Sequence, residues 1–169
     1  MPILRLPPEV KAVLEEFYTC EFTTVNSQGQ PLTWPTEPYY SEPEGQLIIT
    51  SSIAFPVKAY NARRHPQVSL LYSDATGSGL DDPPGVLVQG KVSSVEELTN
   101  DPPWSYEMFK ESIERQPNTR KFVASSIARS MFTFQFQRLA IFIEPLHILV
   151  WPQRDFSKPP TEIEVAYVE

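Results

Sequence analysis

The sequence has very little cysteine and histidine. Cys20 is the single cysteine among 169 residues, and His65 and His147 are the two histidines. One cysteine cannot form a disulfide within the chain, and zinc sites need several Cys or His ligands at a spacing that is absent here. The pattern also gives Cys20 no polarising partner, which a thiolate nucleophile would need. We therefore expect no metal centre, and the sequence singles out no catalytic residue.

Long hydrophobic runs are also lacking. The most apolar stretch, from Leu139 to Trp151, contains Glu144, Pro145 and His147, and it is too short to span a bilayer. The N-terminus has no apolar segment of the kind that a secretory signal peptide requires. These absences predict a soluble, cytoplasmic protein with no membrane partner.

Positive charge is scarce. Lys and Arg together number 14 against 21 Asp and Glu, which gives a net charge of −7. A nucleic-acid surface needs clustered basic residues, whereas the local cluster here is limited to Lys58 and the Arg-Arg-His run at 63–65. The chain also has no Walker A motif and no GxGxxG motif after a strand. We expect no nucleic-acid partner and none of the common nucleotide-binding folds.

Glycine is scarce as well, with 6 residues, whereas proline is abundant, with 18. Paired prolines punctuate the connections at 7–8, 83–84, 102–103 and 159–160. A hydrophobic share of 41% is sufficient for a packed core rather than a disordered chain. We expect one domain over residues 1–169, which ends in a proline-rich tail at 152–169.

The first half of the chain predicts a mainly β protein. We expect a helix from Pro8 to about Tyr18, strands at 20–25 and 31–40 joined by a turn at 26–29, a strand from Leu47 into the hydroxyl residues at 50–52, a helix from about Pro56 to 64, and a strand at 68–72. Pro35 and Pro38 cannot donate hydrogen bonds to a neighbouring strand. The strand at 31–40 is therefore irregular or lies at a sheet edge.

The second half continues the same architecture. We expect a strand at 85–95 with a bulge at Gly90, a helical insertion at about 100–130 with helices near 104–115 and 119–129, and strands at 132–143, 146–151 and 163–168. Seven or so strands joined mostly by hairpins, with one crossover helix, favour a closed antiparallel barrel.

The segment from Gly45 to Tyr72 has the most informative chemistry. An apolar strand ends in Thr50, Ser51 and Ser52, and a short helix follows with Lys58 in its first turn. Hydroxyls, the free N–H groups of a helix start and an ammonium group suit a phosphate. The same residues also occur where hydroxyls only end a strand and lysine only coats a helix.

The order of these segments resembles the pyridoxamine 5′-phosphate oxidase-like family, the FMN-binding split barrels. The similarity is carried by Phe22–Val25, the turn at 26–31, Leu32–Pro35, the segment 45–72 and the strand 85–92 with its glycine. It implies an α+β, mainly β fold: a closed antiparallel split β-barrel with an N-terminal helix, a short crossover helix and a helical insertion. It also implies a homodimer with two flavins at the subunit interface.

The resemblance assigns cofactor contacts to nine residues. Thr50, Ser51, Ser52 and Lys58 match the positions that bind the FMN phosphate. The segment Thr33, Trp34, Pro35 and Thr36 matches the strand against which the isoalloxazine ring lies, and Gln89 matches a position that reaches the flavin from the side. Family members often bring a C-terminal Trp or Arg to the flavin, but Trp151 and Arg154 are better interpreted as part of an exposed turn.

The implied function is an FMN-dependent oxidoreductase that transfers hydride or electrons through flavin N5 to or from a small molecule. Oxidation of pyridoxamine phosphate itself is disfavoured, because the tail after Trp151 offers only Arg154 and Lys158 for a substrate phosphate. One alternative is the deazaflavin F420 on the same fold. Another is a non-catalytic flavin- or haem-binding protein, in which His65 or His147 would have to ligate the iron.

Overall fold

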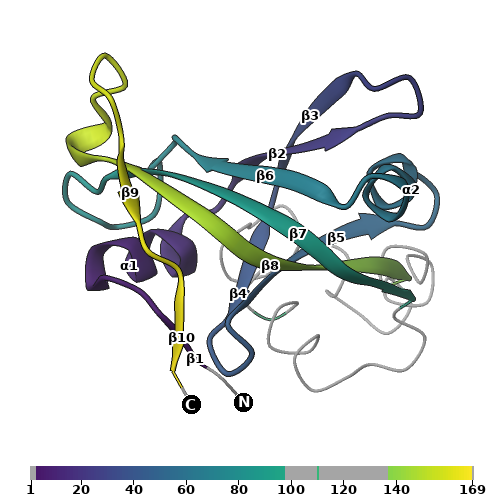
Figure 1. The fold of residues 1–169 in the computed structure, drawn as a ribbon, viewed down its shortest axis with the longest axis horizontal. Helices are drawn as coiled ribbons and strands as arrows, with labels where there is room; N and C mark the ends of the chain where they lie inside the picture. The colour runs from purple at the N-terminus through teal and green to yellow at the C-terminus, as the bar shows by residue number, and fades with distance from the viewer. Residues whose placement is uncertain (1–2, 98–109, 111–136, 169) are drawn as a thin grey trace, which may run out of the picture.

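The structure, a computed structural model, describes residues 3–97, 110 and 137–168. The predicted helices near 104–115 and 119–129 fall outside the described residues, except for Lys110, and so does the predicted strand segment 132–136. The two ends of the described chain lie side by side, because strand β1 (Ile3–Arg5) pairs antiparallel with strand β10 (Ala166–Val168) (Figure 1).

Helix α1 (Pro8–Glu16) forms where it was predicted. Proline at the first helical position costs no hydrogen bond there, and Glu9 in the first turn interacts favourably with the helix dipole. Val10, Val13 and Leu14 lie on one face and are buried in the core. The helix is therefore held by packing of its apolar face.

A β-hairpin follows and projects from the body of the protein (Figure 1). Strands β2 (Cys20–Val25) and β3 (Pro31–Thr36) pair in antiparallel register. The side chain of Asn26 accepts hydrogen bonds from the backbone N–H groups of Gln28 and Gln30, both at 2.9 Å. Asparagine side chains stabilise turns in this way, so the predicted hairpin is confirmed.

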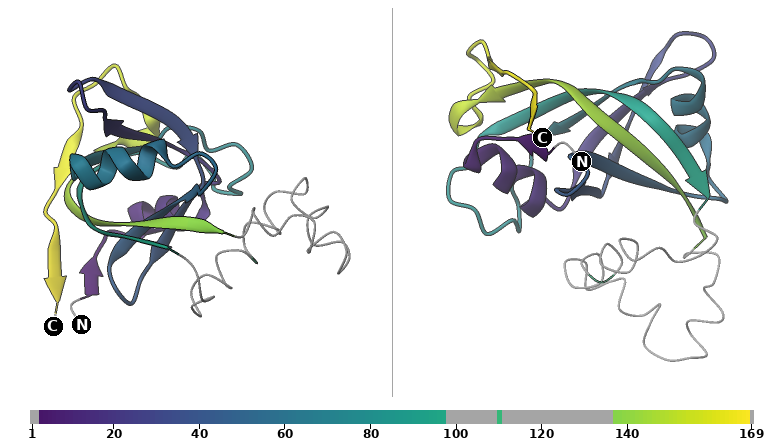
Figure 2. Two further views of the ribbon diagram at one scale, coloured as in Figure 1. Left: turned by 90° about the vertical axis from the view of Figure 1, so that its right-hand side faces the viewer. Right: turned by 60° about the horizontal axis from the view of Figure 1, so that its bottom comes forward.

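The remaining elements complete one antiparallel sheet. They are β4 (Pro38–Ser41), β5 (Gln46–Ser52), α2 (Val57–Arg64), β6 (Gln67–Tyr72), β7 (Gly85–Glu97), β8 (Arg138–Trp151), a short 3-10 helix (Pro152–Arg154) and β9 (Thr161–Ile163). The strand order is β3-β2-β6-β7-β8-β5-β4, and β9 pairs with β8. The left view of Figure 2 looks from the end that carries α2, and it shows the sheet curving around the core.

The sheet has the predicted antiparallel split-barrel architecture, but it is not closed. Strands β3 and β4 stand at the two ends of the hydrogen-bonded order and do not pair with each other. The predicted strand at 31–40 breaks at Glu37 into these two strands, between Pro35 and Pro38. Because proline has no N–H, this segment cannot form a continuous ladder.

The core lies on the inner face of the curved sheet. Phe22, Leu70, Val88 and Ile148 are cross-strand neighbours on β2, β6, β7 and β8, and all four are fully buried. Such cross-strand apolar pairs are the main source of sheet stability. The register of these strands is therefore fixed, because a shift by one residue would expose the whole row.

Strand β8 differs from the prediction of two strands at 132–143 and 146–151. It runs without interruption from Arg138 to Trp151. Pro145 lies opposite Gly90 at a register shift between Gln89 and Gly90, and Leu146 is left without a partner. The bulge absorbs the proline, so the strand continues instead of ending.

The bulge predicts a strict requirement for glycine at position 90. A Cβ atom there would lie 2.7 Å from Ile143 Cγ2 and 2.8 Å from the Glu144 carbonyl oxygen. We expect Gly90→Ala to lower the free energy of unfolding by about 2 kcal/mol through this clash, measured by urea unfolding. Gln67→Ala, on the exposed face of β6, should be neutral. A Gly90→Ala variant as stable as the parent would contradict the packing described here.

Candidate functional site

The candidate phosphate site is built at the end of β5. Thr50, Ser51 and Ser52 are the last residues of this strand, and they lie opposite Ala140, Leu139 and Arg138 of β8. Successive side chains of a strand point to opposite faces. Thr50 and Ser52 therefore share one face of the sheet, with Arg138 opposite Ser52, whereas Ser51 points to the other face.

The hydroxyl groups of Thr50 and Ser52 are free to donate to an anion. The Thr50 oxygen accepts a hydrogen bond from Arg138 Nη1 at 3.3 Å, and the Ser52 oxygen accepts one from the Ala54 backbone N–H at 3.2 Å. A hydroxyl can accept and donate at the same time. In both contacts the oxygen accepts, so each hydroxyl proton remains available to a ligand.

Ser51 has a different environment from its two neighbours. Its side chain is fully buried, and its hydroxyl donates to the Phe55 carbonyl oxygen at 2.9 Å. This hydrogen bond closes the turn between β5 and α2. A second hydrogen bond, from the Phe55 N–H to the Ser52 carbonyl oxygen at 3.0 Å, stabilises the same turn. The structure therefore does not bring the Ser51 proton together with the donors of Thr50 and Ser52.

Lys58 adds a second positive charge near Arg138. It lies in the first turn of α2 and is half-buried. Burial lowers the pKa of its ammonium group, and the positive charge of Arg138 lowers this pKa further. The electrostatic effect shows that the two cations lie in one neighbourhood, although they are far apart in the sequence.

Arg138 is the site residue that sequence reasoning missed. Burial lowers the pKa of its guanidinium, and the carboxylate of Glu37 acts in the opposite direction. Arg138 is the first residue of β8, and in the sequence this strand resembles an ordinary amphipathic strand. Only the pairing of β8 with β5, which places Arg138 opposite Ser52, reveals its position, and no sequence motif signals that pairing.

Strand β3 presents a free edge in the segment assigned to the flavin ring. The N–H of Asn26 donates to the Gln30 carbonyl at 2.9 Å, which makes this a hydrogen-bonded pair. Hydrogen-bonded and non-hydrogen-bonded pairs alternate along an antiparallel ladder, so residues 31, 33 and 35 direct their backbone groups away from β2. Because Pro31 and Pro35 have no N–H, Thr33 supplies the free N–H of this edge within β3.

The four side chains of this segment divide between two faces. Thr33 and Pro35 are on the outer face, where the Thr33 and Thr23 hydroxyls lie 2.8 Å apart. Trp34 and Thr36 are on the side of the buried residues of β2, and the Thr36 hydroxyl donates to the Trp34 carbonyl at 3.3 Å. A planar ring would therefore meet the backbone of β3 together with the side chains of one face only.

The ring strand and the phosphate site meet at one corner of the fold. Thr36 ends β3, and the next residue, Glu37, is the carboxylate that acts on Arg138. Strand β4 then starts at Pro38, which pairs with Ile49, next to Thr50. The two segments proposed from the sequence are thus contiguous in space.

Gln89 lies apart from this corner. It is exposed and lies opposite His147 on β8. At a rise of about 3.3 Å per residue, His147 is about 30 Å along β8 from Arg138. The structure therefore does not bring Gln89 together with the phosphate site within one subunit.

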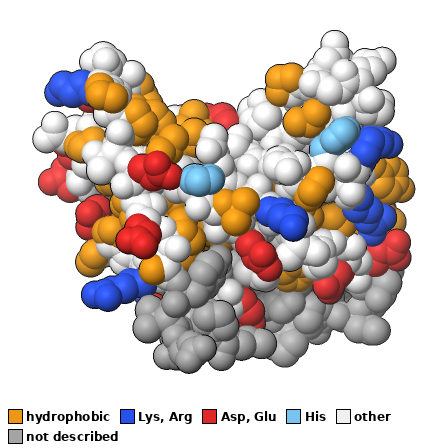
Figure 3. Space-filling model, viewed as in Figure 1, with side chains coloured by type: hydrophobic (Ala, Val, Ile, Leu, Met, Phe, Trp, Pro, Cys, Tyr) orange, Lys and Arg blue, Asp and Glu red, His pale blue; other side chains and the backbone are white. Residues whose placement is uncertain are grey.

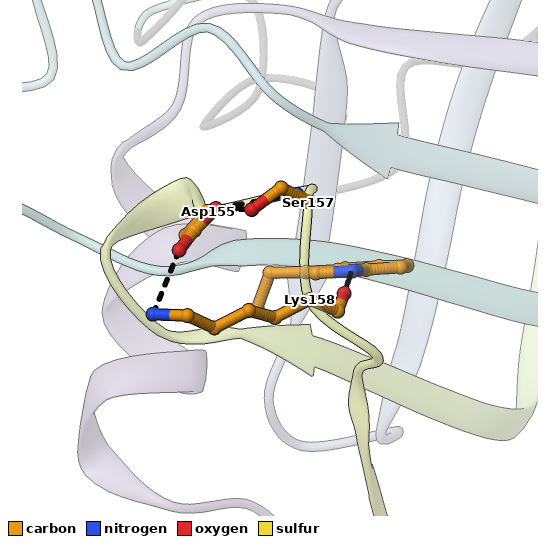
Figure 4. Close-up of polar contacts among 4 residues, drawn as sticks. Asp155, Ser157 and Lys158 are labelled. Atoms are coloured by element: carbon orange, nitrogen blue, oxygen red, sulfur yellow. Dashed lines mark hydrogen bonds and ion pairs between the residues drawn. The ribbon is translucent and has the colours of Figure 1, made fainter.

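Trp151 and Arg154 belong to the turn that was expected for them. The indole N–H of Trp151 donates to the Lys158 carbonyl at 3.0 Å, and Lys158 pairs with Asp155 at 2.8 Å (Figure 4). Arg154 Nη1 donates to the Pro83 carbonyl at 2.9 Å. Trp151 therefore holds the connection between β8 and β9, and Arg154 joins that connection to the loop before β7.

The two histidines and the cysteine offer no alternative centre. His65 caps the C-terminal end of α2, as predicted. His147 was expected to be a core residue, but it is exposed and lies 2.8 Å from Glu162, because its side chain points outward from β8. Cys20 is buried, and burial raises the pKa of its thiol well above the usual range. Within residues 3–97 and 137–168, no cluster of three Cys, His, Asp or Glu side chains could hold a metal ion.

The surface charge near α2 differs from that of the whole chain. Basic side chains gather at the right of the view in Figure 3, over α2, although the net charge is −7. Arg63 and Arg64 are the exposed basic residues of its last turn. Among the described helices, none is long and apolar enough to cross a membrane.

Comparison with known proteins agrees with the fold. Similar solved structures include a putative pyridoxamine 5′-phosphate oxidase from Listeria innocua (19% identity, TM-score 0.54, covering 84% of this chain and 94% of that one). An F420 reductase is similar at 17% identity and TM-score 0.56, covering 85% and 98%. HutZ, the heme storage protein from Vibrio cholerae, is similar at 17% identity and TM-score 0.55, covering 87% and 95%. At these identities the likeness shows the fold alone.

Sequence comparison is more specific about the family. A search of curated proteins found no match. Residues 6–140, which include both the ring strand and the phosphate site, match the family described as pyridoxamine 5′-phosphate oxidase. The chain therefore belongs to the pyridoxamine 5′-phosphate oxidase family.

Proposed function

We propose that the protein binds FMN and acts as a flavin-dependent oxidoreductase on a small molecule. The observation that carries the proposal is the arrangement at the end of β5. Two hydroxyl groups with free protons and two half-buried cations share one corner of the fold. The positive charge of Arg138 disfavours the charged form of Lys58, and a ligand phosphate would add a negative charge that favours it.

The donors at this corner fit a phosphate group. Thr50 and Ser52 each contribute a hydroxyl proton, and the Lys58 ammonium contributes up to three N–H groups. The first turn of α2 adds free backbone N–H groups and the positive end of the helix dipole. In this proposal Ser51 shapes the site through its bond to Phe55 rather than by contacting the phosphate.

The ring would lie along β3, beyond Glu37. The free N–H of Thr33 and the carbonyl groups of the same edge suit the donors and acceptors of a flavin pyrimidine ring, and Trp34, Pro35 and Thr36 complete the strand against which it rests. When bound, FMN supplies hydride or electron transfer through N5. The chain orients the cofactor by its two ends and shields one side of the ring from water.

We further propose a homodimer with the flavins at the subunit interface. Gln89 lies too far from the phosphate corner to share a flavin with it in one subunit. A flavin held between two subunits could contact Gln89 from the other one. This arrangement accounts for both parts of the expected cofactor site.

The F420 reductase among the similar structures supports a second candidate, the deazaflavin F420. F420 also carries a phosphate, but as a diester. Haem binding, as in HutZ, has less support from the residues, because His147 already pairs with Glu162 and His65 caps α2.

Titration of the purified protein with FMN tests the proposal. We expect saturable binding, followed by quenching of flavin fluorescence, with riboflavin binding more weakly because it lacks the phosphate. FMN and riboflavin of equal affinity would contradict the phosphate site. No binding of FMN together with tight binding of F420 would favour the second candidate.

Lys58→Met tests the ammonium group. The substitution keeps the length of the side chain and removes the charge, so we expect FMN affinity to fall about tenfold to a hundredfold, while riboflavin affinity stays the same. Lys91→Met, at an exposed position of β7, is the matched control and should bind FMN like the parent. Unchanged FMN affinity in the Lys58 variant would argue against this contact.

Ser52→Ala and Ser51→Ala form a matched pair on adjacent residues. Loss of the Ser52 hydroxyl should weaken FMN binding about tenfold and leave the thermal midpoint unchanged. Loss of the Ser51 hydroxyl leaves the Phe55 carbonyl unpaired and should lower the free energy of unfolding by about 1 kcal/mol. The reverse assignment, measured by fluorescence titration and thermal melting, would refute the orientation of β5.

A further inference from the structure

Exposed apolar side chains gather around the start of α2. Among the residues that the structure describes, seven large apolar side chains are exposed, and four of them lie between residues 53 and 60. These four, Ile53, Phe55, Val57 and Tyr60, are 45%, 79%, 53% and 51% exposed, and we call them the α2 patch. Single exposed apolar residues are common on protein surfaces, whereas a group of them marks a contact surface.

Helix α2 faces the core with small residues and the solvent with larger apolar ones. Ala59 and Ala62 are fully buried, and the buried Asn61 side chain donates to a threonine hydroxyl of β2 at 3.2 Å. Val57 and Tyr60 are three positions apart, so they share the exposed face of the helix. In an ordinary surface helix the larger apolar residues face the core. Core packing therefore does not account for the α2 patch.

Positive charge accompanies the patch, although the chain as a whole is acidic. The sequence has no Asp or Glu at 45–73. Arg64 is exposed and follows Tyr60 by four positions, so it lies on the same helix face. Arg63 is also exposed, and it donates to the Val95 carbonyl oxygen at 3.1 Å, beside the acidic end of β7. Figure 3 shows apolar and basic side chains together over α2, at the right of the view.

An anionic lipid bilayer matches this combination of side chains. Aromatic and aliphatic residues beside basic ones are typical of helices that lie in a membrane interface, and an anionic leaflet attracts nearby arginines. Helix α2 stands at one end of the molecule (Figure 1), where side chains can enter a headgroup layer without a matching pocket. A nucleic acid would use aromatic rings and cations but not the aliphatic Ile53 and Val57. Because charges are screened beyond about 8 Å at physiological ionic strength, the distant acidic residues oppose this contact only weakly.

We propose that the α2 patch and Arg64 form a docking surface for an anionic membrane, with Phe55 as its main apolar anchor. The hydrogen bonds that hold the turn of Phe55 use its backbone N–H and carbonyl groups, so its side chain can enter the bilayer without disturbing the turn. The surface is independent of the proposed flavin site. The expectation of no membrane partner rested on the lack of a spanning segment and did not consider the exposed face of α2.

Flotation of the full chain with lipid vesicles tests the docking surface. The vesicles contain either phosphatidylcholine alone or phosphatidylcholine and phosphatidylglycerol in equal parts. The parent should bind the mixed vesicles at least tenfold more tightly, and less tightly as salt is added. Excess FMN should leave this binding unchanged, because FMN would fill the candidate phosphate site and not the α2 patch. No flotation with the mixed vesicles, equal binding to both kinds, or displacement by FMN would each overturn the proposal.

Two variants separate the apolar and the charged parts of the surface. Phe55→Ser should weaken binding to the mixed vesicles about tenfold, and Arg64→Gln about fivefold. Both should keep the parental thermal midpoint, because both side chains are exposed. Leu146→Ser removes a 49% exposed apolar side chain from β8 and is the matched control, which should bind like the parent.

Two results with these variants would refute the assignment. If Phe55→Ser and Arg64→Gln bind vesicles like the parent, the membrane contact lies on another surface. If the parent self-associates without binding vesicles, and Phe55→Ser abolishes that association, the α2 patch contacts a second copy of the chain instead.

Discussion

Two positive charges held half-buried at one corner of an antiparallel sheet are the feature on which this account depends. Burial lowers the pKa of both Lys58 and Arg138, and Arg138 also donates a hydrogen bond to Thr50 and interacts with the Glu37 carboxylate. The register of β8 against β5 fixes Arg138, and the buried alanines of α2 fix the helix that carries Lys58. A fold that keeps such charges in place is prepared for an anion.

The second constraint comes from proline. Pro35 and Pro38 interrupt the ladder, so the sheet opens between β3 and β4 instead of closing. This break leaves the backbone of β3 free on one side and places Glu37 where its carboxylate acts on Arg138. The same residues that weaken the sheet therefore form the meeting point of the ring strand and the phosphate site.

Local chemistry made much of this structure predictable. Pro56 and His65 mark the two ends of α2, and both ends were predicted from these residues. The alternation of apolar residues predicted the strands, and Gly90 predicted the position of the bulge. Properties that depend on pairing between distant strands could not be predicted. The role of Arg138 follows from the register of β8 against β5. The exposure of His147 and the continuity of β8 through Pro145 follow from the bulge in β8, where Leu146 has no partner in β7. Gln89 was assigned by resemblance, and only its distance along β7 and β8 separates it from the phosphate corner.

Phosphorus-31 NMR of FMN added to the protein tests the central claim most directly, because it observes the phosphate itself. If Lys58, Arg138 and two hydroxyl groups hold the group as a dianion, the bound resonance is shifted from that of free FMN. Its protonation midpoint then lies below the value of about 6 for a free monoester. A bound flavin whose phosphorus resonance titrates like free FMN would contradict the account.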